Sequence, residues 1–267
     1  MDQSLLRFGM HDFLNASPLL LPLKEKGANV GFQMVTDSPA SLADRLQSGD
    51  LDLAMIPTVE YFRSADRYRI VPNACIASRG PVGTVLFLTK KPISEISSIA
   101  ADIRSRTSVA LLQILFPFSS DLSIHPFLPD PKTMLADHSS ALIIGDSAFT
   151  LGDLDPNVTV YDLSAEWFRH TGKTFVHAVV ALRQGVVLRS AQKNFIQNSK
   201  LEGLRRIKEI VRAHKGLSGV SLEMLEGYLE NKIKYNLDQE AMEGLIHFSN
   251  LCYEHGIIPK KISTKFV

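Results

Sequence analysis

The sequence has little of what marks several large protein classes. Only 2 of its 267 residues are cysteines, and they lie far apart, so a disulfide framework and a CxxC motif are excluded. No apolar run approaches the roughly 18 residues that a membrane-spanning helix needs. The net charge is only +1, which lacks the basic excess typical of nucleic-acid-binding proteins. We therefore expect no membrane partner, no nucleic-acid partner and two reduced thiols.

Common catalytic motifs are also missing. The 8 histidines form no HxxxH or HExxH pattern and no cluster with cysteine, so we expect no metal site. The chain contains no GxxxxGK[ST] phosphate loop, no GxGxxG dinucleotide motif and no GxSxG nucleophile motif. Its start, MDQSLLRFGM, has an acid and a short apolar run in place of the basic, long apolar start of a secretion signal. This start predicts a cytoplasmic protein.

What is present is an alternation of apolar runs and helical patterns. Apolar residues make up 45% of the chain and charged residues 21%, as in ordinary globular proteins. Continuous apolar runs are typical of strands buried on both faces of an α/β sheet. The predicted strands cover 5–9, 30–35, 51–56, 69–77, 84–89, 141–145, 158–163 and 175–183. The predicted helices include 38–49, which Ser38 can cap, and 190–215, 218–235 and 238–255 in the last third.

The stretch DIRSRTSVALLQILF, at 102–116, indicates a binding site for an anion. Hydroxyls of Ser105, Thr107 and Ser108, with the guanidinium of Arg106, stand at the start of an apolar helix. The first turn of a helix leaves N–H groups unpaired and favours a carboxylate by about 0.3–1 kcal/mol. A plain helix cap is the alternative, but one cap needs a single hydroxyl. We therefore favour anion binding at this helix start.

Four further positions are candidate site residues, each with a simpler structural alternative. Asn15 follows a predicted strand and precedes an apolar helix, where it can also serve as a cap. Thr84 follows the glycine-rich turn of SRGPVGT, which allows close approach of a ligand to the backbone. Gly145 and Asp146 end a predicted buried strand, where ligands gather in α/β sheets, although Asp146 can instead cap its own helix. His177 lies within an apolar strand, where a packed role is more common.

Several segments together resemble the chorismate dehydratases of the futalosine route to menaquinone. They occur in the family's order over about residues 5–258 and read FLNASPL, SPASLADRLQSGDLDLAMIPTVEY, CIASRGPVGTVLF, DIRSRTSVALLQILF, ALIIGDSAF, DLSAEWFRHTGKTFVHAVVALR and GYLENKIKYNLDQEAMEGLIHF. The resemblance implies a two-lobed α/β fold of the periplasmic-binding-protein-like type II, with two crossover strands and a helical C-terminal region. Lobe 1 would hold 1–88 and 178–267, lobe 2 would hold 89–177, and the ligand cleft would lie between them.

The resemblance also implies a reaction. Family members dehydrate chorismate to 3-[(1-carboxyvinyl)oxy]benzoate and water, without a metal or organic cofactor. The important asparagine of the family falls on Asn15, and its serine falls on Thr84, which keeps the hydroxyl. This chain departs from the family's TGLPFVFA pattern at Lys173, Thr174 and His177. If these side chains face the cleft, the substrate could differ.

The implied mechanism needs little acid–base power, because loss of water makes an aromatic ring. We expect the helix start at 105–108 to hold one carboxylate, and Asn15 and Thr84 to act on the departing hydroxyl or the proton. Ser38 and Thr58 are weaker candidates for binding from the first lobe. Two alternatives stay open: a non-catalytic binding protein for a small anion, and a related enzyme acting on another carboxylated intermediate. The sequence leaves the oligomeric state undetermined.

Overall fold

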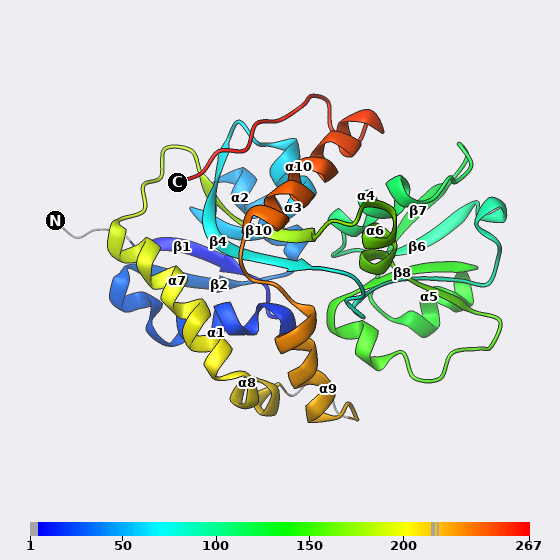
Figure 1. The fold of residues 1–267 in the computed structure, drawn as a ribbon, viewed down its shortest axis with the longest axis horizontal. Helices are drawn as coiled ribbons and strands as arrows, with labels where there is room; N and C mark the ends of the chain where they lie inside the picture. The colour runs from blue at the N-terminus through cyan, green and yellow to red at the C-terminus, as the bar shows by residue number, and fades with distance from the viewer. Residues whose placement is uncertain (1–4, 215–216, 218) are drawn as a thin grey trace.

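The computed structural model describes residues 5–214, 217 and 219–267, and within them it contains two five-stranded sheets (Figure 1). The first sheet has the order β2 (Phe32–Thr36), β1 (Leu6–Met10), β3 (Leu53–Pro57), β10 (Phe175–Arg183) and β4 (Tyr68–Ser78). The second has the order β7 (Ser123–Phe127), β6 (Ser98–Asp102), β8 (Ser140–Ile144), β5 (Val85–Thr89) and β9 (Thr159–Asp162). The α/β class and the two lobes predicted from the sequence are confirmed.

Both sheets are mixed and share one pattern of pairing. In the first, β1 runs parallel to β2 and β3, and β10 runs antiparallel to β3 and β4. In the second, β6 runs parallel to β7 and β8, and β5 runs antiparallel to β8 and β9. Strands β3, β5 and β8 are buried at every position, which explains their continuous apolar sequences. The parallel strands of each sheet therefore end toward the space where the two lobes meet.

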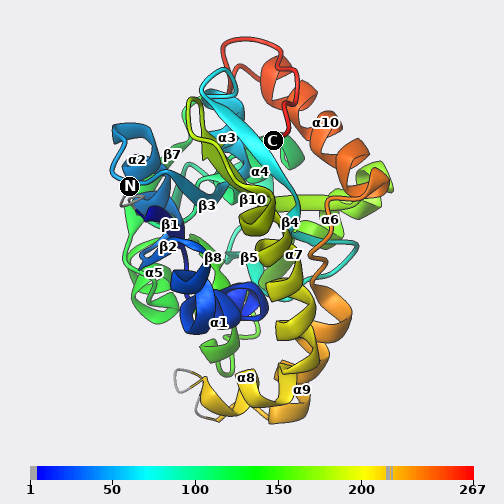
Figure 2. The same ribbon diagram turned by 90° about the vertical axis from the view of Figure 1, so that its left-hand side faces the viewer.

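Helices cover the sheets on both faces (Figures 1 and 2). In the first lobe they are α1 (Ser17–Lys26), α2 (Pro39–Ser48), α3 (Thr58–Arg63), α7 (Ser190–Arg205), α8 (Ile207–Ala213), α9 (Leu222–Gly227) and α10 (Gln239–Glu254). In the second they are α4 (Thr107–Leu115), α5 (Pro131–Asp137) and α6 (Leu163–Thr171). Short turns η1 (Leu14–Ala16), η2 (Gly27–Val30), η3 (Ile93–Glu95), η4 (Gly145–Thr150) and the π-helical η5 (Tyr228–Lys232) connect them.

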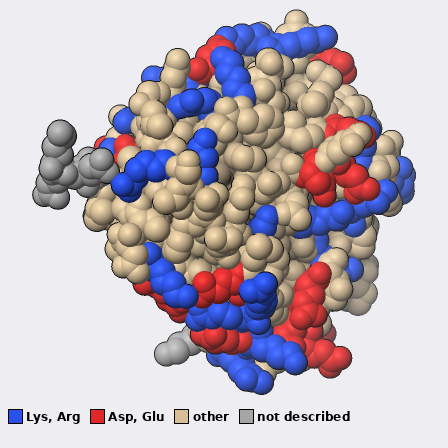
Figure 3. Space-filling view, turned by 60° about the vertical axis from the view of Figure 1, so that its left-hand side comes forward, with Lys and Arg blue, Asp and Glu red and all other residues tan. Residues whose placement is uncertain are grey.

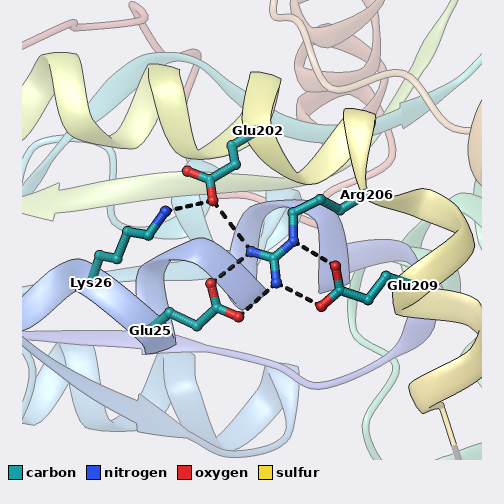
Figure 4. Close-up of polar contacts among 5 residues, drawn as sticks. All are labelled: Glu25, Lys26, Glu202, Arg206 and Glu209. Carbon is teal, nitrogen blue, oxygen red and sulfur yellow. Dashed lines mark hydrogen bonds and ion pairs between the residues drawn. The ribbon is translucent and has the colours of Figure 1, made fainter.

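Helix α7 crosses α1 at very short range. A Cβ atom on Gly203 would lie 1.8 Å from the backbone oxygen of Pro18, so only glycine fits at this crossing. Beyond it, the helix predicted over 190–215 is divided into α7 and α8 at Arg206. The Arg206 guanidinium donates to Glu25 of α1 at 2.6 and 2.7 Å and to Glu209 of α8 at 2.7 and 2.8 Å (Figure 4). The break thus lets one cation join three helices.

Two strands are absent from the sequence prediction, and one predicted helix is shorter than expected. Strand β6, SIAAD, is short and rich in small residues, and β7, SIHPF, is a largely exposed edge strand with a proline. Both lack the apolar run used to recognise the other strands. The helix predicted over 218–235 is wrong in extent, because the chain is helical only over α9 and η5. Part of the predicted break at 216–219 lies outside the described residues.

The chain passes between the lobes twice, through residues 79–84 after β4 and through residues 172–174 between α6 and β10. Figure 1 shows these passages as the narrow region between the two lobes. The lobe limits 1–88 with 178–267 and 89–177 stay a prediction. On the face drawn in Figure 3, basic and acidic side chains lie together along the lower edge and most of the centre is uncharged. Charges of both signs therefore share this face, as expected for a net charge of +1.

Candidate active site

A pocket lies between the two sheets and has a volume of about 570 Å³, including the part that faces solvent. This volume is in the range of small-molecule sites. It is lined by His11, Phe13, Asn15, Pro39, Pro57, Ile76, Val82, Thr84, Val85, Arg104, Ser105, Arg106, Thr107, Ser108, Ile144, Gly145, His177, Ala178 and Ile233. Of the site residues named from the sequence, Ser38, Thr58 and Asp146 lie outside this lining, and the others belong to it.

Three buried polar atoms of this lining have no hydrogen-bond partner within residues 5–214, 217 and 219–267. They are Asn15 Oδ1, Ser105 Oγ and His11 Nδ1, and we call such atoms open. Buried polar groups are nearly always paired, and an unpaired one costs about 1–3 kcal/mol. Open atoms grouped around one pocket therefore mark positions where a ligand can supply the missing hydrogen bonds.

The helix end of the pocket consists of Ser105, Arg106, Thr107 and Ser108. Helix α4 begins at Thr107, and Arg106 is its N-cap residue. Among the described residues, no side-chain hydrogen bond caps the helix at this position. The Thr107 hydroxyl is already used, because it accepts a hydrogen bond of 3.2 Å from Val59 N. The open Ser105 Oγ and the unpaired amides of the first turn stay available for a carboxylate. This end therefore has the features of an anion site, with Ser105 as its free hydroxyl.

Arg106 joins the two lobes. Its Nη1 and Nη2 donate to Asp44 of α2 at 2.8 and 2.7 Å, and Nη1 lies 3.5 Å from Glu60 of α3. The hydrogen bonds to Asp44 hold the pKa of Arg106 above its ordinary value. Because two carboxylates neutralise this guanidinium, it is a bridge between α4 and the helices of the first lobe.

Arg104 is a pocket residue that the sequence did not single out. Its guanidinium pairs with buried Asp102 and donates 3.1 Å to Ser147 Oγ. Its Cζ lies 4.7 Å from the ring centroid of Phe13, within the range of a cation–π contact. Arg104 of the second lobe thus packs on the ring of Phe13 in the first lobe, and this contact closes one side of the pocket.

The amide end of the pocket is lined by Asn15 and Thr84, and Tyr228 lies behind them. The Tyr228 hydroxyl lies 2.9 Å from Thr84 Oγ1. Burial raises the pKa of Tyr228 far above its usual value, in spite of the hydrogen bond to Thr84 and the nearby Asn15 side chain, so the phenol stays protonated. All three groups are uncharged. This end therefore offers hydrogen bonds without a charge.

Asp146 positions Asn15 from behind the pocket wall. Its carboxylate accepts from Leu14 N at 3.0 Å, at the start of turn η1, and from His214 Nε2 at 2.9 Å. The hydrogen bond to Asp146 raises the pKa of His214. The preceding Gly145 has φ +64, and a Cβ there would lie 2.9 Å from the Phe13 ring. Asp146 therefore caps a turn of the opposite lobe and not its own helix.

Asp162 positions Thr84, as Asp146 positions Asn15. Its carboxylate accepts from Val82 N at 2.9 Å and from Gly83 N at 2.6 Å. It also caps α6 through the amides of Ser164 and Ala165. Burial raises the pKa of Asp162 more than these hydrogen bonds lower it. One carboxylate thus fixes the glycine turn that leads into Thr84.

Two histidines of the lining are neutral. His177 Nε2 lies 2.8 Å from Ser78 Oγ and 3.3 Å from Ser164 Oγ, so the crossover strand packs it against two hydroxyls. Burial lowers its pKa to about 4. Burial also lowers the pKa of His11 to about 4. Near neutral pH, neither imidazole adds charge to the pocket.

The remaining positions named from the sequence have structural contacts. Ser38 caps α2, accepting 3.2 Å from Ser41 N. Thr58 begins α3 and is fully buried with an open hydroxyl. Two of the three departures from the family pattern face α10 and not the pocket: Lys173 pairs with Glu243 at 3.5 Å, and buried Thr174 lies where α10 passes at Gly244. Only His177 of the three enters the pocket.

Within residues 5–214, 217 and 219–267, no group of three or more His, Cys, Asp or Glu side chains is placed to hold a metal ion. Cys75 and Cys252 are free and buried, and burial raises the pKa of each thiol to about 12. None of the helices within those residues has the length and apolar character needed to cross a bilayer.

Solved structures share this architecture. A protein of Archaeoglobus fulgidus is 16% identical, with a TM-score of 0.77, over 97% of this chain and 100% of that chain. The periplasmic aliphatic sulphonate binding protein of Escherichia coli is 13% identical, with a TM-score of 0.62, over 98% and 96% of the two chains. The fold and the pocket between its lobes define a protein of the periplasmic-binding-protein-like class.

The sequence assigns the chain more closely. The profile of a family described as menaquinone biosynthesis matches residues 6–254, and the chain belongs to this family. A chorismate dehydratase of Thermus thermophilus is 27% identical over 256 residues, which are 90% of this chain and 93% of that protein. The family predicted from the sequence motifs is thereby confirmed, and the protein has a role in menaquinone biosynthesis.

The sequence prediction missed His11, Phe13, Arg104 and Tyr228. His11 and Phe13 lie four and two residues before Asn15, and Arg104 lies directly before the predicted anion site, so proximity to a motif was an available signal. Tyr228 is separated from Thr84 by 144 residues. No local pattern connects these two positions.

Proposed function

We propose that the protein is a chorismate dehydratase, which converts chorismate to 3-[(1-carboxyvinyl)oxy]benzoate and water. The proposal is supported by the family, by the 27% identity to a chorismate dehydratase and by the pocket. The observation that carries it is the pair of open atoms at the two ends of the pocket, Ser105 Oγ and Asn15 Oδ1. Chorismate offers a matching pair of groups, a carboxylate and a hydroxyl.

The helix end would bind a carboxylate of the substrate. Ser105 Oγ donates to it, together with the free backbone amides at the start of α4. A hydrogen bond to a charged group contributes about 1.5–3 kcal/mol, and the helix end adds up to about 2 kcal/mol when partly buried. This binding is strong enough to fix one end of the molecule without a free arginine.

The amide end would bind the hydroxyl that leaves. An open carbonyl oxygen on Asn15 needs a donor, and the ring hydroxyl is the only O–H donor of chorismate when both carboxylates are ionised. Thr84 lies on the same side of the pocket and can donate to the oxygen of that hydroxyl. The two side chains together hold both the hydrogen and the oxygen of the leaving group.

The reaction needs positioning more than acid–base strength. The proton leaves the ring carbon that bears the enolpyruvyl ether, and the electrons of that C–H bond complete the aromatic ring. The neighbouring C–O bond breaks, and its electron pair leaves with the hydroxyl oxygen, which takes up a proton to form water. The enolpyruvyl carboxylate of the substrate is the proton acceptor we favour. The apolar residues of the lining would hold the ring so that the two breaking bonds are aligned.

The test is to incubate the purified protein with chorismate and to follow the product by ultraviolet absorbance and chromatography. An enzyme-free sample corrects for spontaneous breakdown of chorismate. We expect an aromatic product with the retention time and mass of 3-[(1-carboxyvinyl)oxy]benzoate. Tight binding without turnover would instead identify an anion-binding protein, and indifference to chorismate would point to another carboxylated substrate. Either result would overturn the proposal.

A further inference from the structure

Tyr228 is a buried side chain behind the pocket that no sequence motif assigned to the site. It opens η5, a single π-helical turn, and its ring packs edge-to-face on Phe149 with the centroids 5.1 Å apart. Its hydroxyl lies 2.9 Å from Thr84 Oγ1, and the side chain of Asn15 is near enough to lower the pKa of the phenol. π-Helical turns are rare and occur frequently at functional sites. One phenol thus hydrogen-bonds to one proposed catalytic residue and neighbours the other, without lining the pocket.

The direction of the hydrogen bond between Tyr228 and Thr84 follows from burial. The phenol of Tyr228 is buried, and an unpaired buried donor costs about 1–3 kcal/mol, so its hydrogen must be placed on an acceptor. Thr84 Oγ1, 2.9 Å away, is the acceptor at hand. Tyr228 Oη thus donates to Thr84 Oγ1.

This direction fixes what Thr84 presents to the pocket. Thr84 accepts from Tyr228 with an oxygen lone pair, so its own hydrogen is left for the pocket that it lines. The raised pKa of Tyr228 keeps the phenol a donor at every working pH. The Thr84 donor is therefore set before any ligand arrives.

We propose that Tyr228 is a positioning residue, whose hydroxyl orients Thr84 as donor toward the leaving hydroxyl. This role rests on the proposed function, because the leaving hydroxyl belongs to chorismate. Tyr228 itself does not touch the substrate. Its removal therefore affects the chemical step more than substrate binding.

The test compares Tyr228→Phe with Tyr235→Phe. Both substitutions remove a buried phenol oxygen, but Tyr235 Oη is open, so its loss leaves no partner unsatisfied. We expect Tyr228→Phe to lower kcat about 10- to 100-fold, as small misplacements of reacting groups do, with KM within about twofold of the wild type. Tyr235→Phe should retain wild-type kcat. Thermal melting of both variants checks that each is folded.

A double-mutant cycle with Thr84→Val tests whether Tyr228 acts through Thr84. If it does, the loss in the double variant is clearly smaller than the product of the two single losses. A wild-type kcat in Tyr228→Phe, equal losses in the two phenylalanine variants, or losses that multiply would each overturn the role. A wild type that is inert toward chorismate overturns the proposed function and this role with it. An active wild type with an unaffected Tyr228→Phe variant overturns the role alone.

Discussion

The two ends of the pocket are built in opposite ways. The helix end is continuous in sequence, Ser105 to Ser108, and it is surrounded by charges that carboxylates neutralise. The amide end brings together Asn15, Thr84 and Tyr228 from three distant parts of the chain, and it is uncharged. A continuous site with a free hydroxyl and free helix-start amides suits binding of a carboxylate. A neutral and assembled site suits orientation of a leaving hydroxyl. The comparison thus assigns affinity to the helix end and chemistry to the amide end.

The largest effect should follow from Asn15→Asp, which changes the chemistry of the amide end at constant size. A carboxylate at this position can only accept hydrogen bonds, and it would add a negative charge beside a dianion. We expect kcat/KM to fall about 10²- to 10³-fold, as when a preorganised polar group is removed from other enzymes. Steady-state kinetics with chorismate measures this loss.

The matched control is Asn198→Asp, which makes the same change at an exposed position of α7. It should keep wild-type kinetics. Comparable activity in Asn15→Asp and Asn198→Asp would contradict a catalytic role for the amide end, and the contrast between the two ends would then fail.

Acid should weaken the fold through the two neutral histidines. The pKa of His11 and His177 falls from 6.5 to about 4 on folding, so the folded state favours the uncharged form. Their contribution to stability is therefore complete above pH 6.5 and is lost as the pH falls toward 4. Each pKa unit corresponds to about 1.4 kcal/mol, which makes the loss about 3 kcal/mol per histidine.

Urea unfolding at several pH values between 7 and 4 checks this prediction. His11→Gln and His177→Gln should each flatten the fall in unfolding free energy over this range. His255→Gln, at an exposed position, should follow the wild type. His214 acts in the other direction, because its raised pKa gives stability that disappears as the pH rises through that value. Identical pH profiles for the wild type and the two pocket variants would show that the pocket interior tolerates charge.

Ser105→Ala should weaken binding at the helix end while leaving the chemical step nearly intact. The lost hydrogen bond to a carboxylate corresponds to about 1.5 kcal/mol or more, so KM should rise about tenfold with kcat within about twofold. Ser120→Ala, at an exposed position of the second lobe, is the control. A large fall in kcat with constant KM would mean that the helix end also takes part in the chemistry.

The same contrast explains how much could be predicted from the sequence. Central strands such as β5 and β8 were recognised because burial on both faces requires an apolar run. The edge strand β7 carries polar residues and a proline, and its pattern is that of a loop. The Ser105–Ser108 turn was recognisable because a helix start is a local feature. Tyr228 was not, because its role depends on a contact 144 residues away.

Arg106 shows what a local motif leaves out. The sequence predicts Arg106 as an anion ligand, because it stands among three hydroxyls. Its guanidinium instead meets Asp44, 62 residues earlier in the chain, and Glu60. A motif shows that a cationic side chain is present. It does not show which carboxylates from other parts of the chain already pair with that side chain. Charge balance is a tertiary property, and it has to be counted in the structure.

The smallest effect, and the sharpest test of Arg106, should come from Asp44→Asn. The pair is largely exposed on the Asp44 side, so its free energy is about 1 kcal/mol or less. If Arg106 serves as a bridge between the lobes, loss of its partner weakens the closed arrangement, and KM should rise about two- to threefold. The rise should disappear in high salt, which screens the original pair. If Arg106 were a substrate ligand restrained by Asp44, the substitution would release it and KM would fall. The sign of the change in KM therefore decides between the two roles, and kcat should stay constant because Asp44 is remote from the amide end.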